Sequence, residues 1–190
     1  FSILVLFAEF NVRRNISWYS IIVLVLGGGI LSLIVTIILN ELSGNPRAAY
    51  WAGPIEEAAK LVVAIFFARK FFLNGQILNG MLCGAAVGAG FAGFETAGYI
   101  IMAAEHGLDP LDTAVLRGRL APFAHVSWSA IMAGAFWLAM KKQRQNNIPS
   151  ILQPSFWRIA VIPIGLHMFW NSLLLDKSEL LRYAKWGICA

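Results

Sequence analysis

The stretch "PIEEAAKLVVAIFF", residues 54–67, places two adjacent carboxylates and one ammonium at the start of an apolar run. The charged residues are Glu56, Glu57 and Lys60. An ionisable group inside a bilayer costs on the order of 3 kcal/mol on insertion scales, so such residues within a membrane span indicate a functional site. Whether this run crosses a membrane therefore decides both the fold and the chemistry.

The composition is that of an integral membrane protein. The 190 residues are 58% hydrophobic and 13% charged. Polar residues fall in short clusters between apolar runs of about twenty residues or more, the length that crosses the hydrocarbon core of a bilayer as a helix. Because an open strand edge in lipid leaves backbone groups unpaired, we expect every span to be helical.

The expected spans are residues 1–10, 17–40, 48–70, 76–104, 120–140 and 157–175, with residues 178–190 opening one more. The chain begins at Phe1 rather than Met, and its first ten residues resemble the end of an interrupted span. We therefore expect one all-α, polytopic transmembrane helix bundle over residues 1–190, truncated at both ends.

The charge pattern sets orientation. A net charge of +5 would suggest nucleic acid as a partner of a soluble protein, but here the basic residues lie beside spans, so we expect no nucleic-acid partner. One side collects Arg13, Arg14, Arg69, Lys70, Lys141, Lys142, Arg144 and Arg158 against Glu9 alone. The positive-inside rule places that side in the cytoplasm. Cys83 and Cys189 are isolated, which indicates neither a disulfide framework nor a thiolate metal site.

Small residues form a stripe along the helix expected at residues 76–104. They recur every fourth residue, at Gly80, Gly84, Gly88 and Ala92. Such a stripe lets a second helix approach closely. It therefore places Phe91 and Glu95 next to a tight helix contact.

Polar residues of four spans fall at a similar depth. Counting 1.5 Å per residue from the outer face puts Glu56, Glu95 and His167 roughly 12 or 13 Å below that face, and His125 about 8 Å below it. We therefore expect a polar site buried among four helices.

Helical spacing adds detail to this site. Lys60 lies four residues after Glu56, and Asn171 four after His167, so each pair shares one helix face. Glu57 is turned about 100° from Glu56, so the two carboxylates should play different roles.

Simpler explanations exist for each of these residues. Pro54 could start its helix, which would leave both carboxylates in a first turn where the helix dipole favours anions. Glu95 could only bond a neighbouring helix, His125 could be an interfacial histidine, and His167 with Asn171 could be a packing pair. It is less plausible that the simpler explanation holds at all four places than that it holds at any one of them.

Three motifs, in order on successive helices, carry a resemblance. "PIEEAAK" (54–60), "GFAGFE" (90–95) and "HMFWN" (167–171) resemble the PrsW family of intramembrane proteases, which is related to the CAAX prenyl protease and bacteriocin-processing membrane proteases. Phe91-x-x-x-Glu95 resembles the Phe-x-x-x-His of the wider superfamily with Glu in place of His. Thr96 stands where Asn is common in the PrsW family.

The resemblance implies an intramembrane endopeptidase. Its substrate would be a single-pass membrane protein such as an anti-sigma factor, cleaved in or near its transmembrane segment close to the extracytoplasmic face. The chain would be a multi-pass protein of the cell membrane, in a prokaryote, with membrane lipid as its other partner.

Amide hydrolysis needs an activated water, stabilisation of the oxyanion and a proton for the leaving amine. We expect Glu56 to act as general base on a water shared with His125 or Glu95. Lys60 would hold Glu57 in place. The candidate catalytic residues are Glu56, Glu57, Glu95, His125, His167 and Asn171, of which the last two are expected to donate to the oxyanion.

Zinc-dependent hydrolysis is an alternative. Two histidines and one or more glutamates form a plausible ligand set with an open position, although the helical His-Glu-x-x-His is absent. The candidate ligands are Glu57, Glu95, His125 and His167. The expected cofactor is therefore either none or zinc.

A different class of function is a transporter or channel that relays protons or ions through buried Glu and His. Such proteins often show inverted repeats around a midplane site. We find no internal repeat, and the charges lie nearer one face. A catalytically silent membrane scaffold is a third alternative.

Overall fold

The computed structural model describes residues 4–5, 9, 16–43, 49–71 and 76–172. Within them it contains helices and no strands, which confirms the all-α prediction. The elements are α2 (Trp18–Val23), a π-helical segment (Leu24–Gly28), α3 (Gly29–Leu42), α4 (Ala49–Phe71), α5 (Ile77–Glu105), α6 (Pro110–Asn146), a 3-10 turn (Ser150–Leu152) and α7 (Pro154–Asn171). The spans expected at 178–190 and over most of 1–10 lie outside the described residues.

Three helices are long and apolar enough to cross a membrane. They are the continuous helix Trp18–Leu42, α5 and α6. A polytopic transmembrane protein is therefore confirmed. The helices expected as spans at 48–70 and 157–175 correspond to α4 and α7, which do not meet the same standard of length and composition. In α4 the reason is its charged residues at positions 56, 57 and 60.

The longest helix, α6, begins well before the expected span at residues 120–140 and ends after it. Asp109 caps its start by accepting a hydrogen bond from Leu111 N at 2.8 Å, and Pro110 occupies the first turn. Asn147 ends it in the left-handed conformation, with φ of 57°. The apolar part of the sequence marked the membrane-like centre of the helix but not its polar ends.

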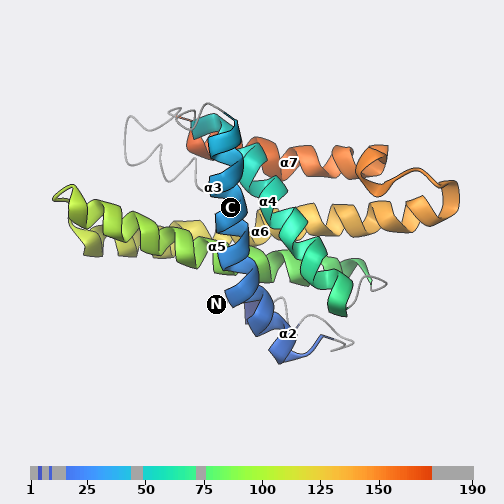
Figure 1. Ribbon diagram of the computed structural model, residues 1–190, viewed down its shortest axis with the longest axis horizontal. Helices are drawn as coiled ribbons and strands as arrows, with labels where there is room; N and C mark the ends of the chain where they lie inside the picture. The colour runs from blue at the N-terminus through green and yellow to red at the C-terminus, as the bar shows by residue number, and fades with distance from the viewer. Residues whose placement is uncertain (1–3, 6–8, 10–15, 44–48, 72–75, 173–190) are drawn as a thin grey trace.

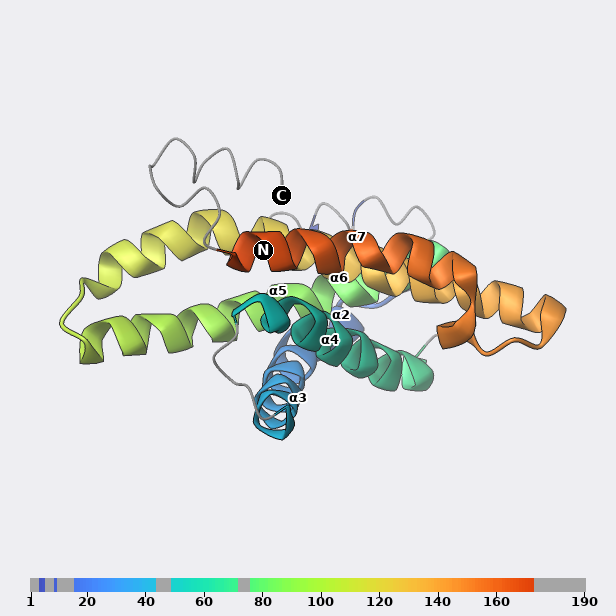
Figure 2. The same ribbon diagram turned by 90° about the horizontal axis from the view of Figure 1, so that it is seen from above.

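Helices α5 and α6 run side by side in opposite directions (Figures 1 and 2) and form the most extensive helix contact among the described residues. A Cβ atom on Gly84 would lie 2.0 Å from Ser129 O, and one on Gly88 would lie 2.3 Å from His125 O. The glycine stripe thus makes the expected tight contact. Its consequence for the site is that the backbone of His125 rests directly against α5.

The continuous helix Trp18–Leu42 crosses α5 steeply (Figure 1). At the crossing, a Cβ atom on Gly29 would lie 2.5 Å from the backbone of Gly90, and one on Gly90 would lie 1.9 Å from Val25 O. Two backbones therefore meet here with no side chain between them. The π-helical segment, which contains Val25, is part of this crossing.

Helix α4 packs against α7 in the same close manner. A Cβ atom on Gly53 would lie 2.9 Å from Met168 N. The helix begins at Ala49, so Pro54 lies in its interior and the explanation that Pro54 starts the helix is wrong. Glu56 and Glu57 therefore lie beyond the first turn, beside α7.

Candidate active site

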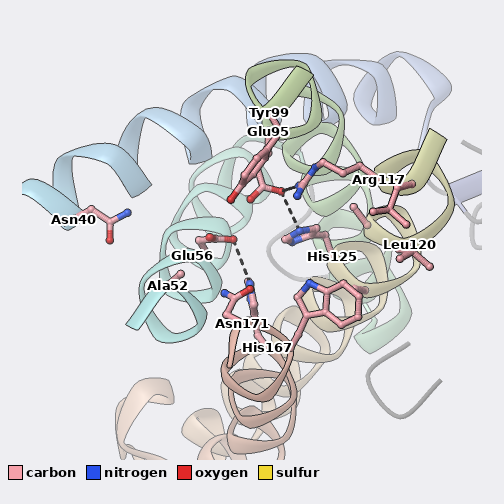
Figure 3. A pocket seen from close by; sticks show the side chains of 14 residues that line it. Asn40, Ala52, Glu56, Glu95, Tyr99, Arg117, Leu120, His125, His167 and Asn171 are labelled. Atoms are coloured by element: carbon pink, nitrogen blue, oxygen red, sulfur yellow. Dashed lines mark hydrogen bonds and ion pairs between the residues drawn. The ribbon is translucent and has the colours of Figure 1, made fainter. Parts of the chain in front are cut away.

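One pocket of about 460 Å³ is lined by residues of α4, α5, α6 and α7, with Asn40 of α3 beside them (Figure 3). They include Glu56 of α4, Glu95 of α5, His125 of α6, and His167 and Asn171 of α7. Residues that lie up to 115 positions apart in the sequence thus meet at one place, as their depths predicted. Because the pocket lies among helices that span or pack within a membrane, its polar lining is enclosed by an apolar bundle.

Glu57 lies behind this lining, fully buried. Lys60 Nζ donates to Glu57 Oε1 at 2.6 Å, as expected, and His167 Nδ1 lies 2.9 Å from the same oxygen. A carboxylate paired with an ammonium only accepts hydrogen bonds, so His167 Nδ1 must be the donor. A neutral His167 therefore presents an unprotonated Nε2 to the pocket.

His125 has the opposite arrangement. Its Nδ1 lies 3.1 Å from Lys60 Nζ, and its Nε2 lies 3.2 Å from Glu95 Oε2. An ammonium cannot accept a hydrogen bond, so His125 Nδ1 is the acceptor and Nε2 carries the hydrogen. One lysine thereby fixes the tautomers of both histidines: that of His125 directly, and that of His167 through Glu57.

Of the two adjacent glutamates, Glu56 is the one that lines the pocket. Its Oε2 lies 3.5 Å from His167 Nε2 and 4.0 Å from Lys60 Nζ. This buried oxygen has no hydrogen-bond partner. The two adjacent glutamates thus have different surroundings, since one oxygen of Glu57 accepts hydrogen bonds from Lys60 and His167, whereas Glu56 lines the pocket.

Aromatic rings fix the histidines in place. Trp128 is 1% exposed, and its ring centroid lies 4.5 Å from that of His167 and 5.7 Å from that of His125. Phe91 lies 5.3 Å from His125, with Lys60 Nζ 4.6 Å from the Phe91 ring centroid. Trp128 was missed by the sequence analysis, although it stands three residues after His125, one turn along the same helix face.

Arg117 was also missed. Its guanidinium pairs with Glu95, its Nε donates to Thr96 Oγ1 at 3.3 Å, and it stacks on Tyr99 at 3.9 Å (Figure 3). The span expected from the sequence starts at residue 120, which leaves Arg117 outside it. Its spacing of eight residues from His125 places both on one face of α6, and that signal was present in the sequence.

Three side chains could hold a metal ion. Donor atoms of Glu56, His125 and His167 all lie within 4.8 Å of one another. His167 fits such a role well, because a metal-bound histidine usually donates its other ring nitrogen to a carboxylate, as Nδ1 does to Glu57. The unpartnered oxygen of Glu56 also fits. His125 fits less directly, since its Nε2 carries a hydrogen here.

This set differs from the one expected from the sequence. Glu57, which we expected as a ligand, is held by Lys60 and His167 and lies outside the group of three, and Glu56 takes its place. Glu95 is likewise outside the group and pairs with Arg117 and His125. Carboxylates at adjacent positions could not be told apart without knowing which faces the pocket.

Comparison with known protein families gives one match. The model of the PrsW family intramembrane metalloprotease matches residues 17–188, which is most of the chain. The chain belongs to the PrsW family. No curated protein and no solved structure matches it.

PrsW membership makes the chain an intramembrane protease, and hence a hydrolase. With its spanning helices it is a multi-pass membrane protein. The family description as a metalloprotease agrees with a donor set that could hold a metal ion.

Proposed function

We propose that this PrsW-family chain hydrolyses a peptide bond with a water activated by Glu56, in the pocket shared by α4, α5, α6 and α7. The observation that carries the proposal is the contrast within the glutamate pair. Lys60 and His167 both bond Glu57 Oε1 behind the pocket lining, while Glu56 lines the pocket and turns a carboxylate oxygen without a hydrogen bond toward the same histidine. A general base needs a free lone pair at the site of the reaction.

The hydrogen-bond pattern supports roles for the two histidines that differ from the sequence expectation. His125 Nε2–H is a donor, so it is suited to stabilise the oxyanion, with the Asn171 amide as a second donor on the pocket wall. His167 Nε2 is an acceptor, so it is suited to position the attacking water beside Glu56. The sequence had favoured His167 as the oxyanion donor.

The proton follows a short path in this scheme. Glu56 accepts a proton from water as the water oxygen attacks the carbonyl carbon. When the carbon–nitrogen bond breaks, Glu56 returns this proton to the leaving nitrogen, and the new acid and amine separate. Glu56 is then ionised again. Lys60 and Glu57 stay paired throughout and hold the tautomers of the histidines.

A metal-assisted form of the same hydrolysis is a second candidate, favoured by the grouped donor atoms of Glu56, His125 and His167 and by the family description. A zinc ion held by these residues would supply Lewis acidity for the reaction. The residues that surround the ligands keep their places in both forms: Glu57 orients His167, and Glu95 faces His125.

The proposed substrate is a single-pass membrane protein of the anti-sigma-factor type, cut near the extracytoplasmic face of the cell membrane. The charge distribution supports this side. Asp and Glu are absent from the sequence between residues 58 and 94 and between residues 113 and 175. Of the exposed cations of these stretches, Arg119 lies near the pocket, whereas Arg69 and Arg144 lie together at the end of α4 that is remote from it. By the positive-inside rule that end is cytoplasmic.

Substitution of the base tests the proposal. Glu56→Gln should lower the cleavage rate of a single-pass substrate in proteoliposomes by about 10²- to 10⁴-fold, the usual contribution of a general base. Glu105→Gln is the matched control, because Glu105 is exposed at the end of α5. An unchanged rate in Glu56→Gln, with normal cleavage by the control, would contradict the assignment of Glu56 as the general base.

A chelator separates the two forms of the reaction. Loss of cleavage on metal removal, with recovery on adding zinc, would assign the metal-assisted form. Full activity after metal removal, verified by elemental analysis, would assign the metal-free form. His125→Ala should lower the rate in both, and His106→Ala serves as control because His106 lies exposed at the end of α5.

A further inference from the structure

A second pocket, of about 470 Å³, lies between the last turns of α4, the last turns of α6 and the turn that leads to α7. It shares no residue with the catalytic pocket. Arg69, which lines it, stands thirteen residues after Glu56 on α4, which is about 20 Å along the helix. This pocket therefore belongs to a different part of the molecule.

The pocket is cationic. Arg69 and Arg144 both line it, and both side chains are exposed. The stretches 58–94 and 113–175 contain no Asp or Glu, so the helix ends that build the pocket supply no carboxylate. Among the residues that the structure describes, no ion pair involves Arg69. An anion in this pocket would meet positive charge without a competing carboxylate from its walls.

One wall of the pocket holds a hydrogen-bond donor, the Gln143 side-chain amide, in a fixed position. Gln143 Oε1 accepts hydrogen bonds from Ser150 N at 2.9 Å and from Ser150 Oγ at 2.5 Å. The oxygen end of this amide is thus committed, which leaves the Nε2 hydrogens as donors. Asn147, in the left-handed conformation, donates its backbone N–H to Gln143 O at 2.8 Å and closes the turn. The position of the amide is therefore fixed before any ligand binds.

The other wall is apolar and comes from Ile65, Phe136 and Met140. An apolar wall makes no favourable contact with a free phosphate ion. A phospholipid, in contrast, carries its glycerol and acyl chains beside its phosphate. Exposed apolar residues such as Phe66 and Val62 lie on α4 next to it, where a lipid chain would run.

We propose that this pocket binds the phosphate group of an anionic phospholipid. The two guanidinium groups grip the phosphate oxygens, for which Arg has the matching fork geometry, and the Gln143 amide donates a third contact. The acyl chains lie along the apolar wall. Cationic pockets between helices on the cytoplasmic side of membrane proteins are suited to such headgroups. The site is independent of the proposed catalytic mechanism.

Thermal unfolding of the purified full chain in a zwitterionic detergent tests this site. Short-chain phosphatidylglycerol should raise Tm in a saturable manner, and the same concentration of short-chain phosphatidylcholine should not. Arg69→Gln should weaken phosphatidylglycerol binding by roughly tenfold, the value of one charge-assisted contact, and Arg69→Lys by less.

The matched control separates a site from general surface charge. Arg158 is exposed on α7 and does not line the pocket. If charge alone attracts the lipid, Arg158→Gln should weaken binding as much as Arg69→Gln, and that result would overturn the proposal. Equal stabilisation by phosphatidylcholine would overturn it too.

Inorganic phosphate distinguishes the source of the anion. A Tm shift from phosphatidylglycerol alone supports a lipid site. An equal shift from inorganic phosphate at the same concentration, lost in Arg69→Gln, would overturn the lipid as the ligand and assign the pocket to a free anion.

Discussion

The two ends of α4 carry charge in opposite ways. Near its start, Glu56, Glu57 and Lys60 are buried, of mixed sign, and linked to histidines of other helices. Near its end, Arg69 is exposed and lines a pocket together with a second cation, Arg144. A buried charge needs a partner, since desolvation otherwise costs several kcal/mol, whereas an exposed charge does not. The charged residues at the buried end therefore depend on one another, and substitution of one should destabilise the protein by leaving another without its partner.

The largest effect on folding should come from Lys60→Met. It leaves Glu57 as a buried carboxylate with one partner in place of two, which should cost about 3–5 kcal/mol of unfolding free energy. Arg69→Met, at the other end of the same helix, should stay within about 0.5 kcal/mol. Denaturation in a zwitterionic detergent measures both. Equal losses in the two variants would erase the distinction between the ends of α4.

Removing both charges sharpens the comparison. Lys60→Met combined with Glu57→Leu should recover much of the lost stability, because an apolar pair of similar size replaces a buried ion pair at little or no cost. Cleavage should remain lost, since the double variant no longer fixes either histidine tautomer. A double-mutant cycle on Tm and on cleavage rate measures the two properties separately. Recovery of cleavage together with stability would show that the tautomers are set elsewhere.

A smaller effect is expected at the rim of the pocket. Arg117 pairs with Glu95, but both side chains are partly exposed, at 21% and 15%. Such a pair contributes at most about 1 kcal/mol to stability. Arg117→Gln should lower the cleavage rate about tenfold, because Glu95 then loses one of the two groups that fix its position beside His125. Arg117→Lys should restore part of the rate, and Arg119→Gln, on the same helix, is the control.

The sequence was sufficient for the type of fold and for bringing four polar side chains together. Runs of apolar residues predicted helices, and depth counting brought Glu56, Glu95, His125 and His167 to one level. The stripe at Gly84 and Gly88 predicted a close helix contact. These inferences depend on period and length, which are local properties of the chain.

Other features depend on contacts between helices and were out of reach. Which glutamate faces the pocket, and which nitrogen of each histidine carries hydrogen, follows from where Lys60 lies relative to α6 and α7. The sequence analysis missed Arg117 for a different reason, because the span expected there began at residue 120 and left out the polar start of α6. Asp109 and Pro110, a helix start signal, would have corrected that boundary.

The crossing of the first helix over α5 has one more consequence. Gly29 and Gly90 meet as bare backbone, so this contact point is set by the two main chains rather than by side chains. Asn40 lies eleven residues beyond this pivot, about 16 Å along α3, on the rim of the catalytic pocket. A tilt of about 10° would move it by about 3 Å. A change of crossing angle at this backbone contact would therefore move a residue that lines the pocket.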